Sequence, residues 1–150
     1  MRTVIELGLN EQSIKLLEEY IRRFGKTLTP RTEFHSTVYY SESIHICRDE
    51  YSTRYLSERL PIKLNPETYS LDVFGNNNLV LKYENYSVKE IETFLRKRKN
   101  GNPSFSNEYP NFNPHITLGK NFDRKHLKFS TFLLGENLVF DSFSWNFKGK

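Results

Sequence analysis

One short phrase occurs twice in this chain and constrains its fold more than any other feature. The copies are His35-Ser36-Thr37-Val38 and His115-Ile116-Thr117-Leu118, each a His-x-Thr followed by an aliphatic residue. Both copies lie in runs of β-branched and aromatic residues, which predict strands. Residues i and i+2 of a strand point to the same face, so each strand presents one imidazole beside one hydroxyl. If the two strands lie side by side, two imidazoles and two hydroxyls line one groove.

Such a groove suits the metal-free cleavage of a phosphodiester. One imidazole can take a proton from the attacking hydroxyl or water, and the other can protonate the leaving 5′-oxygen. The unperturbed pKa of histidine, about 6.5, lets both protonation states exist near neutrality. The two threonine hydroxyls can donate hydrogen bonds to the phosphoryl oxygens. Because the two motifs are nearly symmetric, the sequence leaves open which histidine is the acid and which the base.

The paired motifs resemble those of the two-histidine (2H), LigT-like phosphoesterases. The resemblance implies that His35 and His115 are the acid–base pair and that Thr37 and Thr117 hold the phosphoryl group. It implies an α+β fold of two pseudo-symmetric αβ lobes, in which antiparallel sheets form a concave central cleft and helices lie outside. It also implies one such domain over residues 1–150, with no cofactor.

The whole chain, including its first nine residues, also resembles phage-encoded members of this family, the anti-CBASS nucleases. This implies hydrolysis of 3′,5′-linked cyclic di- and trinucleotide immune signals to linear products in the cytoplasm of a bacterial host. Three alternatives stay open. The chain could open terminal 2′,3′-cyclic phosphates on RNA ends, sequester a nucleotide without cleaving it, or bind RNA.

Composition sets the outer limits. A chain of 150 residues is long enough for one domain with a core, and 12 Phe and 9 Tyr supply its bulk. A net charge of +4 favours a small polyanionic ligand over a long nucleic acid, which needs many phosphate contacts. The single cysteine, Cys47, suits a reducing compartment, and no apolar run predicts a membrane span or a signal peptide.

Hydrophobic periodicity alone predicts a mostly antiparallel α+β chain. Ser87 with Glu90 predicts a capping box, and Gly75-Asn76-Asn77-Asn78 predicts a hairpin turn. The predicted helices are Glu11–Phe24, capped by Asn10, Asp49–Leu60 and 87–99. The predicted strands are Met1–Leu9, Glu33–Ser41, Ser43–Cys47, Ile62–Phe74 with a break near Pro66, Leu79–Tyr83, the second motif, and a final strand or hairpin over Leu138–Phe147.

Bases need stacking partners and phosphates need cations. The candidates that lie in loops or at strand ends are Trp145, Tyr109, Phe74 and Lys26, with Arg31 as a further cation. His45 and Cys47 could form an i, i+2 ligand pair, but no second cysteine or carboxylate cluster accompanies them. We therefore predict no metal site, and we expect His45 to be structural and His126 to lie on the surface.

Overall fold

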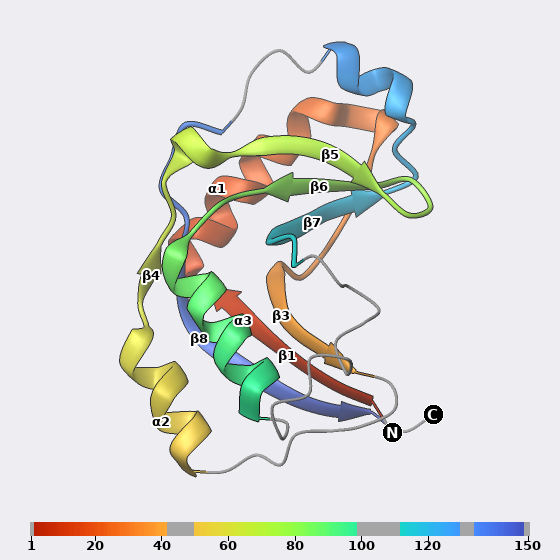
Figure 1. The fold of residues 1–150 in the computed structure, drawn as a ribbon. Helices are drawn as coiled ribbons and strands as arrows, with labels where there is room; N and C mark the ends of the chain where they lie inside the picture. The colour runs from red at the N-terminus through yellow and green to blue at the C-terminus, as the bar shows by residue number, and fades with distance from the viewer. Residues whose placement is uncertain (1, 42–49, 99–111, 130–133, 149–150) are drawn as a thin grey trace.

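Two antiparallel sheets form the centre of the molecule, and the helices lie outside them (Figure 1). The computed structural model describes residues 2–41, 50–98, 112–129 and 134–148. Within these residues each sheet has four strands. The first sheet runs in the order β3 (His35–Ser41), β1 (Arg2–Leu9), β8 (Val139–Lys148) and β4 (Ile62–Lys63); the second runs β2 (Thr29–Pro30), β7 (His115–Lys120), β6 (Asn78–Lys82) and β5 (Ser70–Phe74).

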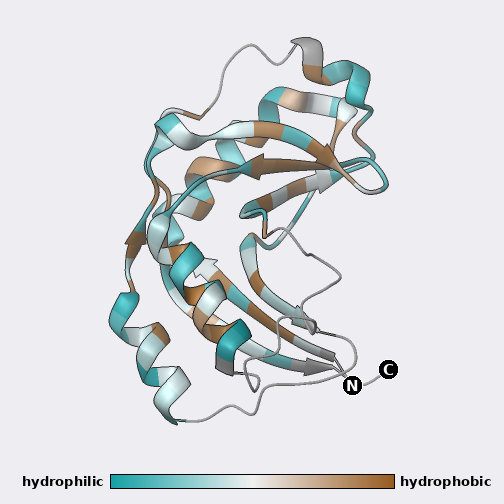
Figure 2. Ribbon diagram, in the orientation of Figure 1, coloured by the Kyte–Doolittle hydropathy of each residue, from teal (hydrophilic) through white to brown (hydrophobic). Residues whose placement is uncertain are grey.

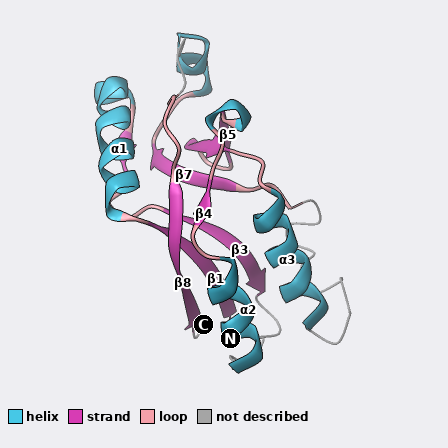
Figure 3. Cartoon of the chain, turned by 90° about the vertical axis from the view of Figure 1, so that its left-hand side faces the viewer, coloured by secondary structure: helices cyan, strands magenta, loops and turns pink. Residues whose placement is uncertain are grey.

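The described helices are α1 (Glu11–Ile21), α2 (Glu50–Arg59) and α3 (Tyr86–Arg98), with 3₁₀ turns η1 (Arg22–Thr27), η2 (Pro66–Thr68) and η4 (Arg124–Phe129). Ring contacts connect helix α1 to the end of β7. Tyr20 of α1 packs edge-to-face on Phe24, and Phe24 packs edge-to-face on Phe122, which follows β7. Helix α3 packs against β3 of the other sheet. In the turned view α1 and α3 lie at opposite sides of the molecule (Figure 3).

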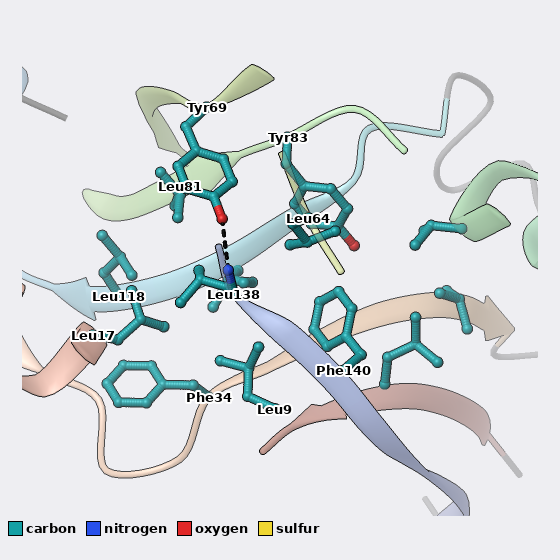
Figure 4. Packing of buried hydrophobic residues seen from close by; sticks show 14 of the residues in the cluster. Leu9, Leu17, Phe34, Leu64, Tyr69, Leu81, Tyr83, Leu118, Leu138 and Phe140 are labelled. Carbon is teal, nitrogen blue, oxygen red and sulfur yellow. Dashed lines mark hydrogen bonds between the residues drawn. The ribbon is translucent and has the colours of Figure 1, made fainter. Parts of the chain in front are cut away.

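The core follows from strand alternation. In β1 the side chains of Ile5, Leu7 and Leu9 are buried, and hydrophobic residues run along β6 (brown in Figure 2). The strand residues pack with side chains from α1 and from the connecting segments (Figure 4). Tyr69 satisfies its hydroxyl within this cluster, since it accepts from the Leu138 amide at 3.0 Å and donates to the Glu136 carbonyl at 3.0 Å. Because one face of each strand is buried in this cluster, the pairing register of the strands is strongly specified.

The two motif strands share a local distortion that relates the lobes to each other. On β1, Glu6 stands opposite Thr37 but Ile5 stands opposite Tyr39, so Val38 is an extra residue. On β6, Val80 stands opposite Thr117 but Leu79 stands opposite Gly119, so Leu118 is the matching extra residue. Each β-bulge therefore falls on the aliphatic residue that follows His-x-Thr. The expected α+β fold with two pseudo-symmetric lobes is confirmed.

Two of the local predictions are confirmed and one was wrong. Of the two forms expected for the final segment, the single strand is the one found, β8, in which a register shift beside Leu9 absorbs Asp141. The segment Ile62–Phe74 breaks at Pro66, as expected, into β4 and β5, which belong to different sheets. Asn85, not Ser87, caps α3, because its side-chain oxygen accepts from the Val88 amide at 3.0 Å.

Other predictions agree with the structure or fall outside it. Asn10 caps α1 by accepting from the Ser13 amide at 2.9 Å, as expected. Gly75 and Asn77 adopt positive φ in the turn between β5 and β6. The predicted strand Ser43–Cys47 and most of the loop before Pro114 lie outside the described residues. Among the described helices, none is long and apolar enough to cross a membrane.

Candidate active site

The first motif strand is tied to the second by Ser36, the middle residue of the first motif. Its buried hydroxyl donates to the backbone carbonyl of His115 at 2.9 Å. The same oxygen lies 2.6 Å from the Tyr83 hydroxyl. Since the only hydroxyl hydrogen of Ser36 goes to a carbonyl, Tyr83 must be the donor in that contact. Burial raises the pKa of Tyr83, which keeps this donor protonated. The two strands that carry the histidines are therefore joined in the core.

His35 lies beside a carboxylate. Its Nε2 forms an ion-pair contact with Oε2 of Glu6, and the two side chains are 30% and 13% exposed. The other oxygen of Glu6 accepts from the Asn146 side-chain amide at 3.0 Å, so β8 anchors the carboxylate. Gly8, opposite His35, allows close approach of β8, because an added Cβ would lie 2.5 Å from Oγ of Ser142. Three neighbouring strands thus fix the surroundings of His35.

His115 has different neighbours. Its Nδ1 lies 2.7 Å from the Asn113 carbonyl oxygen, which can only accept, so Nδ1 carries the proton and Nε2 carries the lone pair of the neutral ring. The Phe74 ring packs against the imidazole at 4.8 Å between centroids, with 69° between the planes. Burial lowers the pKa of His115; the Asn113 carbonyl opposes this shift, and the charge of His35 adds to it. The surroundings therefore favour the neutral imidazole.

A cavity of about 530 Å³ opens on the His35 side of the site. Its lining is mostly polar and comes from β1, from the segment before β3, and from β8. The lining residues are Glu6, Leu7, Gly8, Arg31, Glu33, His35, Ser142, Phe143, Ser144 and Asn146. His115 is not among them, so the cavity extends from one histidine and not evenly from both. A ligand that fills this cavity would lie against the first sheet, beside His35.

The two motif threonines stand at matching positions. Thr37 lies opposite Glu6 and Thr117 opposite Val80, and both threonines are half-buried. By strand alternation each shares a face with the histidine two residues before it. The structure thus brings both motifs to one region through β3 and β7.

The predicted binding residues lie in different places. Phe74 contacts His115. Trp145 is only 9% exposed and stands opposite Ile5, on the face of the sheet away from Glu6 and His35, so it belongs to the core and not to the cavity. Lys26 is exposed in η1, which leads to β2 at the Gly119 and Lys120 end of β7, the end away from His115.

Tyr109, His45 and Cys47 lie outside the described residues. Arg31 lines the cavity, and its amide donates to the Leu118 carbonyl at 2.9 Å. His126 is half-buried and packs its ring against Phe122, which follows the end of β7 that lies away from His115. Among the described residues no group of three or more His, Cys, Asp or Glu is arranged to hold a metal ion.

Sequence reasoning missed Glu6, Asn146 and Lys82. Glu6 had a signal, because it is the one charged residue between Val4 and Leu9 in an otherwise apolar strand. Lys82 stands opposite His115, and its ammonium lies 3.7 Å from a carboxylate oxygen of Asp72. Asn146 had no signal, because its role depends on the register of β8 against β1.

Compared by sequence, the chain matches no protein-family model and no curated protein. Compared by structure, it is similar to a solved phosphoesterase, with a TM-score of 0.65 at 14% identity over 96% of this chain and 86% of that one. E. coli LigT in its apo form matches with a TM-score of 0.64 at 14% identity, over 96% and 85% of the two chains. LigT complexed with 3′-AMP matches with a TM-score of 0.61 at 12% identity, over 96% and 84%. The chain has the LigT-like 2H phosphoesterase fold.

Proposed function

We propose that this protein is a metal-independent phosphodiesterase that opens 3′,5′-linked cyclic di- and trinucleotides to linear products. In a bacterial host cytoplasm this reaction would remove the signals of CBASS antiphage defence. The observation that carries the proposal is the pairing of two His-x-Thr strands through the Ser36 to His115 hydrogen bond. The choice of substrate is carried by the resemblance of the chain to the phage nucleases of this family.

The proposed mechanism uses four side chains. One of His35 and His115 takes the proton of the attacking hydroxyl or water, and the other protonates the 5′-oxygen that leaves. Thr37 and Thr117 donate to the non-bridging oxygens while charge moves through the phosphoryl group. If the neighbouring 2′-hydroxyl attacks, a 2′,3′-cyclic phosphate forms first, and its opening by water reverses the two histidine roles.

The surroundings of the site support a nucleotide ligand. The cavity of about 530 Å³ lies within the usual range for small-molecule sites, and Ser142, Ser144 and Arg31 give it hydroxyl and guanidinium donors. Phe74, beside His115, offers an aromatic surface where a base could stack. The proposed site excludes Trp145, which is buried in the core, and Lys26, which lies near the end of β7 away from His115.

A second candidate is the opening of 2′,3′-cyclic phosphates at RNA ends. The observation that favours it is that a solved structure of similar fold, E. coli LigT, holds 3′-AMP, a nucleotide with a terminal 3′-phosphate. The four motif residues would serve this reaction equally well.

The test is chromatography of 3′,3′-cyclic GMP–AMP and cyclic triadenylate after incubation with the protein in excess EDTA. A parallel tube holds an RNA with a terminal 2′,3′-cyclic phosphate, and His35→Ala/His115→Ala is the control. We expect linear products from the cyclic nucleotides with the wild-type protein alone. Cleavage of the RNA end alone would favour the second candidate. Loss of activity in EDTA that zinc restores would contradict the metal-independent mechanism.

A further inference from the structure

The two halves of the site match in backbone but not in charge. The position opposite Thr37 is Glu6, and the matching position opposite Thr117 is Val80. The position opposite His35 is Gly8, and the matching position opposite His115 is Lys82. One histidine therefore has a carboxylate on the adjacent strand, and the other has an aliphatic side chain and an ammonium.

We propose that this asymmetry fixes the direction of the proposed reaction: His35, held by Glu6, is the acid that protonates the leaving 5′-oxygen, and His115 is the base. The inference rests on the proposed function. Glu6 is then a positioning residue, since it acts through His35.

The carboxylate of Glu6 lies against a ring nitrogen of His35. An anionic oxygen in contact with Nε2 can form a charge-assisted hydrogen bond with an imidazolium. Glu6 is held in place on its other side by the Asn146 amide at 3.0 Å. The other charged groups that line the cavity with His35 are Arg31 and Glu33, and no ion pair joins either of them to the imidazole in the described structure.

The neighbours of His115 favour the neutral imidazole. The Asn113 carbonyl holds the proton on Nδ1, which leaves the Nε2 lone pair able to accept one. Burial disfavours the charged ring, and its pKa is lowered. The charge of His35 on β3 opposes a second positive charge on this ring. Lys82 stands opposite His115 on β6, and its ammonium is paired with the Asp72 carboxylate at 3.7 Å.

The proton count closes in this direction. The attacking hydroxyl gives its proton to Nε2 of His115 while its oxygen bonds to phosphorus. The bond from phosphorus to the 5′-oxygen breaks with its electron pair on that oxygen. His35 keeps the Nε2 proton that faces Glu6, gives the proton on its other ring nitrogen, Nδ1, to the departing oxygen, and becomes neutral. Each histidine then holds the state from which the reverse transfer would begin.

A sulfur substitution tests which histidine is the acid, because a thiolate leaves without a proton. The probe is cyclic diadenylate in which one 3′,5′ link carries sulfur in place of the 5′-bridging oxygen. Both links compete within one molecule, so their cleavage ratio does not depend on the affinity of the probe. Products are separated by chromatography in EDTA and identified by mass.

We expect His35→Ala to shift the ratio towards the sulfur link by at least about 100-fold relative to wild type, the usual scale of acid catalysis. His115→Ala should slow both links by a similar factor and leave the ratio near that of wild type. Glu6→Gln should shift the ratio the same way as His35→Ala, by about 10-fold. Glu33→Gln removes a carboxylate from the same cavity and should leave the ratio unchanged.

Two results would overturn the inference while leaving the proposed function intact. The first is a shift towards sulfur in His115→Ala and none in His35→Ala. The second is a Glu6→Gln variant that is slower on both links with an unchanged ratio and an unchanged unfolding midpoint, which would make Glu6 merely structural. If the wild-type protein cleaves neither this probe nor cyclic diadenylate, the proposed function itself fails.

Discussion

The two motif strands lie in equivalent frames and differ in what surrounds them. Each pairs with an antiparallel neighbour, each has its bulge on the residue after His-x-Thr, and each holds a half-buried histidine and threonine. Yet His35 contacts Glu6, whereas His115 contacts the Asn113 carbonyl and the Phe74 ring. The comparison shows that the repeated motif determines where the histidines lie, while the neighbouring residues determine the polar and charged groups around each imidazole.

Removal of either imidazole is the strongest way to test this comparison. His35→Ala and His115→Ala should each reduce turnover of a cyclic dinucleotide by about 10²–10⁴-fold, the range for general acid–base groups. Both side chains are partly exposed, so the unfolding midpoint should change little. Single-turnover rates and thermal unfolding measure the two effects. A near-normal rate in either variant would falsify the two-histidine mechanism.

The middle residues of the motifs provide a second test. Ser36 bonds to His115 and Tyr83, whereas its counterpart Ile116 is simply buried. Ser36→Ala should lower the free energy of unfolding by about 1–3 kcal/mol, because the buried Tyr83 hydroxyl loses its acceptor. Urea unfolding gives this value.

The control for Ser36→Ala is a double-mutant cycle. Tyr83→Phe added to Ser36→Ala should cost less than the sum of the single changes, because the unpaired hydroxyl is then absent. Full additivity of the two changes would show that the pair is not coupled.

Substitution of two glycines, one in each sheet, allows the tightness of packing in the two sheets to be compared. A Cβ on Gly119 would lie 2.5 Å from the backbone oxygen of Thr29 and 2.6 Å from Cδ1 of Leu28, whereas on Gly8 its near contact would be the Ser142 hydroxyl. Gly119→Ala should therefore destabilise the fold by about 1–3 kcal/mol, and Gly8→Ala by less than about 1 kcal/mol, since a hydroxyl can rotate away. Chemical unfolding of both variants gives the order, and equal losses would contradict it.

The smallest expected effect is on pH dependence. Because burial lowers the pKa of His115 from its usual 6.5, the base should stay neutral to lower pH, and the acidic limb of kcat/KM should lie below 6.5. Phe74→Ala exposes the ring and should move that limb upward by a fraction of a unit. An NMR titration of the His115 ring checks the assignment. A wild-type acidic limb above 6.5 would contradict the shift.

Local patterns predicted the part of the site that lies within one strand. The i, i+2 spacing placed His35 with Thr37 and His115 with Thr117, and the residue types predicted a strand over Met1–Leu9. The contact between Glu6 and His35 could not be predicted, because it depends on the pairing of strands far apart in the sequence. Trp145 shows the same limit, since its pairing opposite Ile5 decides which face it occupies.

The break at Pro66 was visible in the sequence, but its consequence was not. A proline removes one ladder hydrogen bond, which predicts an interrupted strand. That β4 and β5 then join separate sheets follows from which edges are free once the other strands have paired. Such competition between partners is a property of the whole fold.

The position of β8 also sets the order in which the protein can be made. β8 lies between β1 and β4 in the first sheet, yet it follows all the other described strands along the chain. During translation, the edge of β1 that pairs with β8 stays without this partner until residues 139–148 leave the ribosome. Asn146, which holds Glu6 in place, and the β8 residues that line the cavity all belong to this late segment. The nascent chain therefore gains its second motif strand before the cavity beside the first is complete.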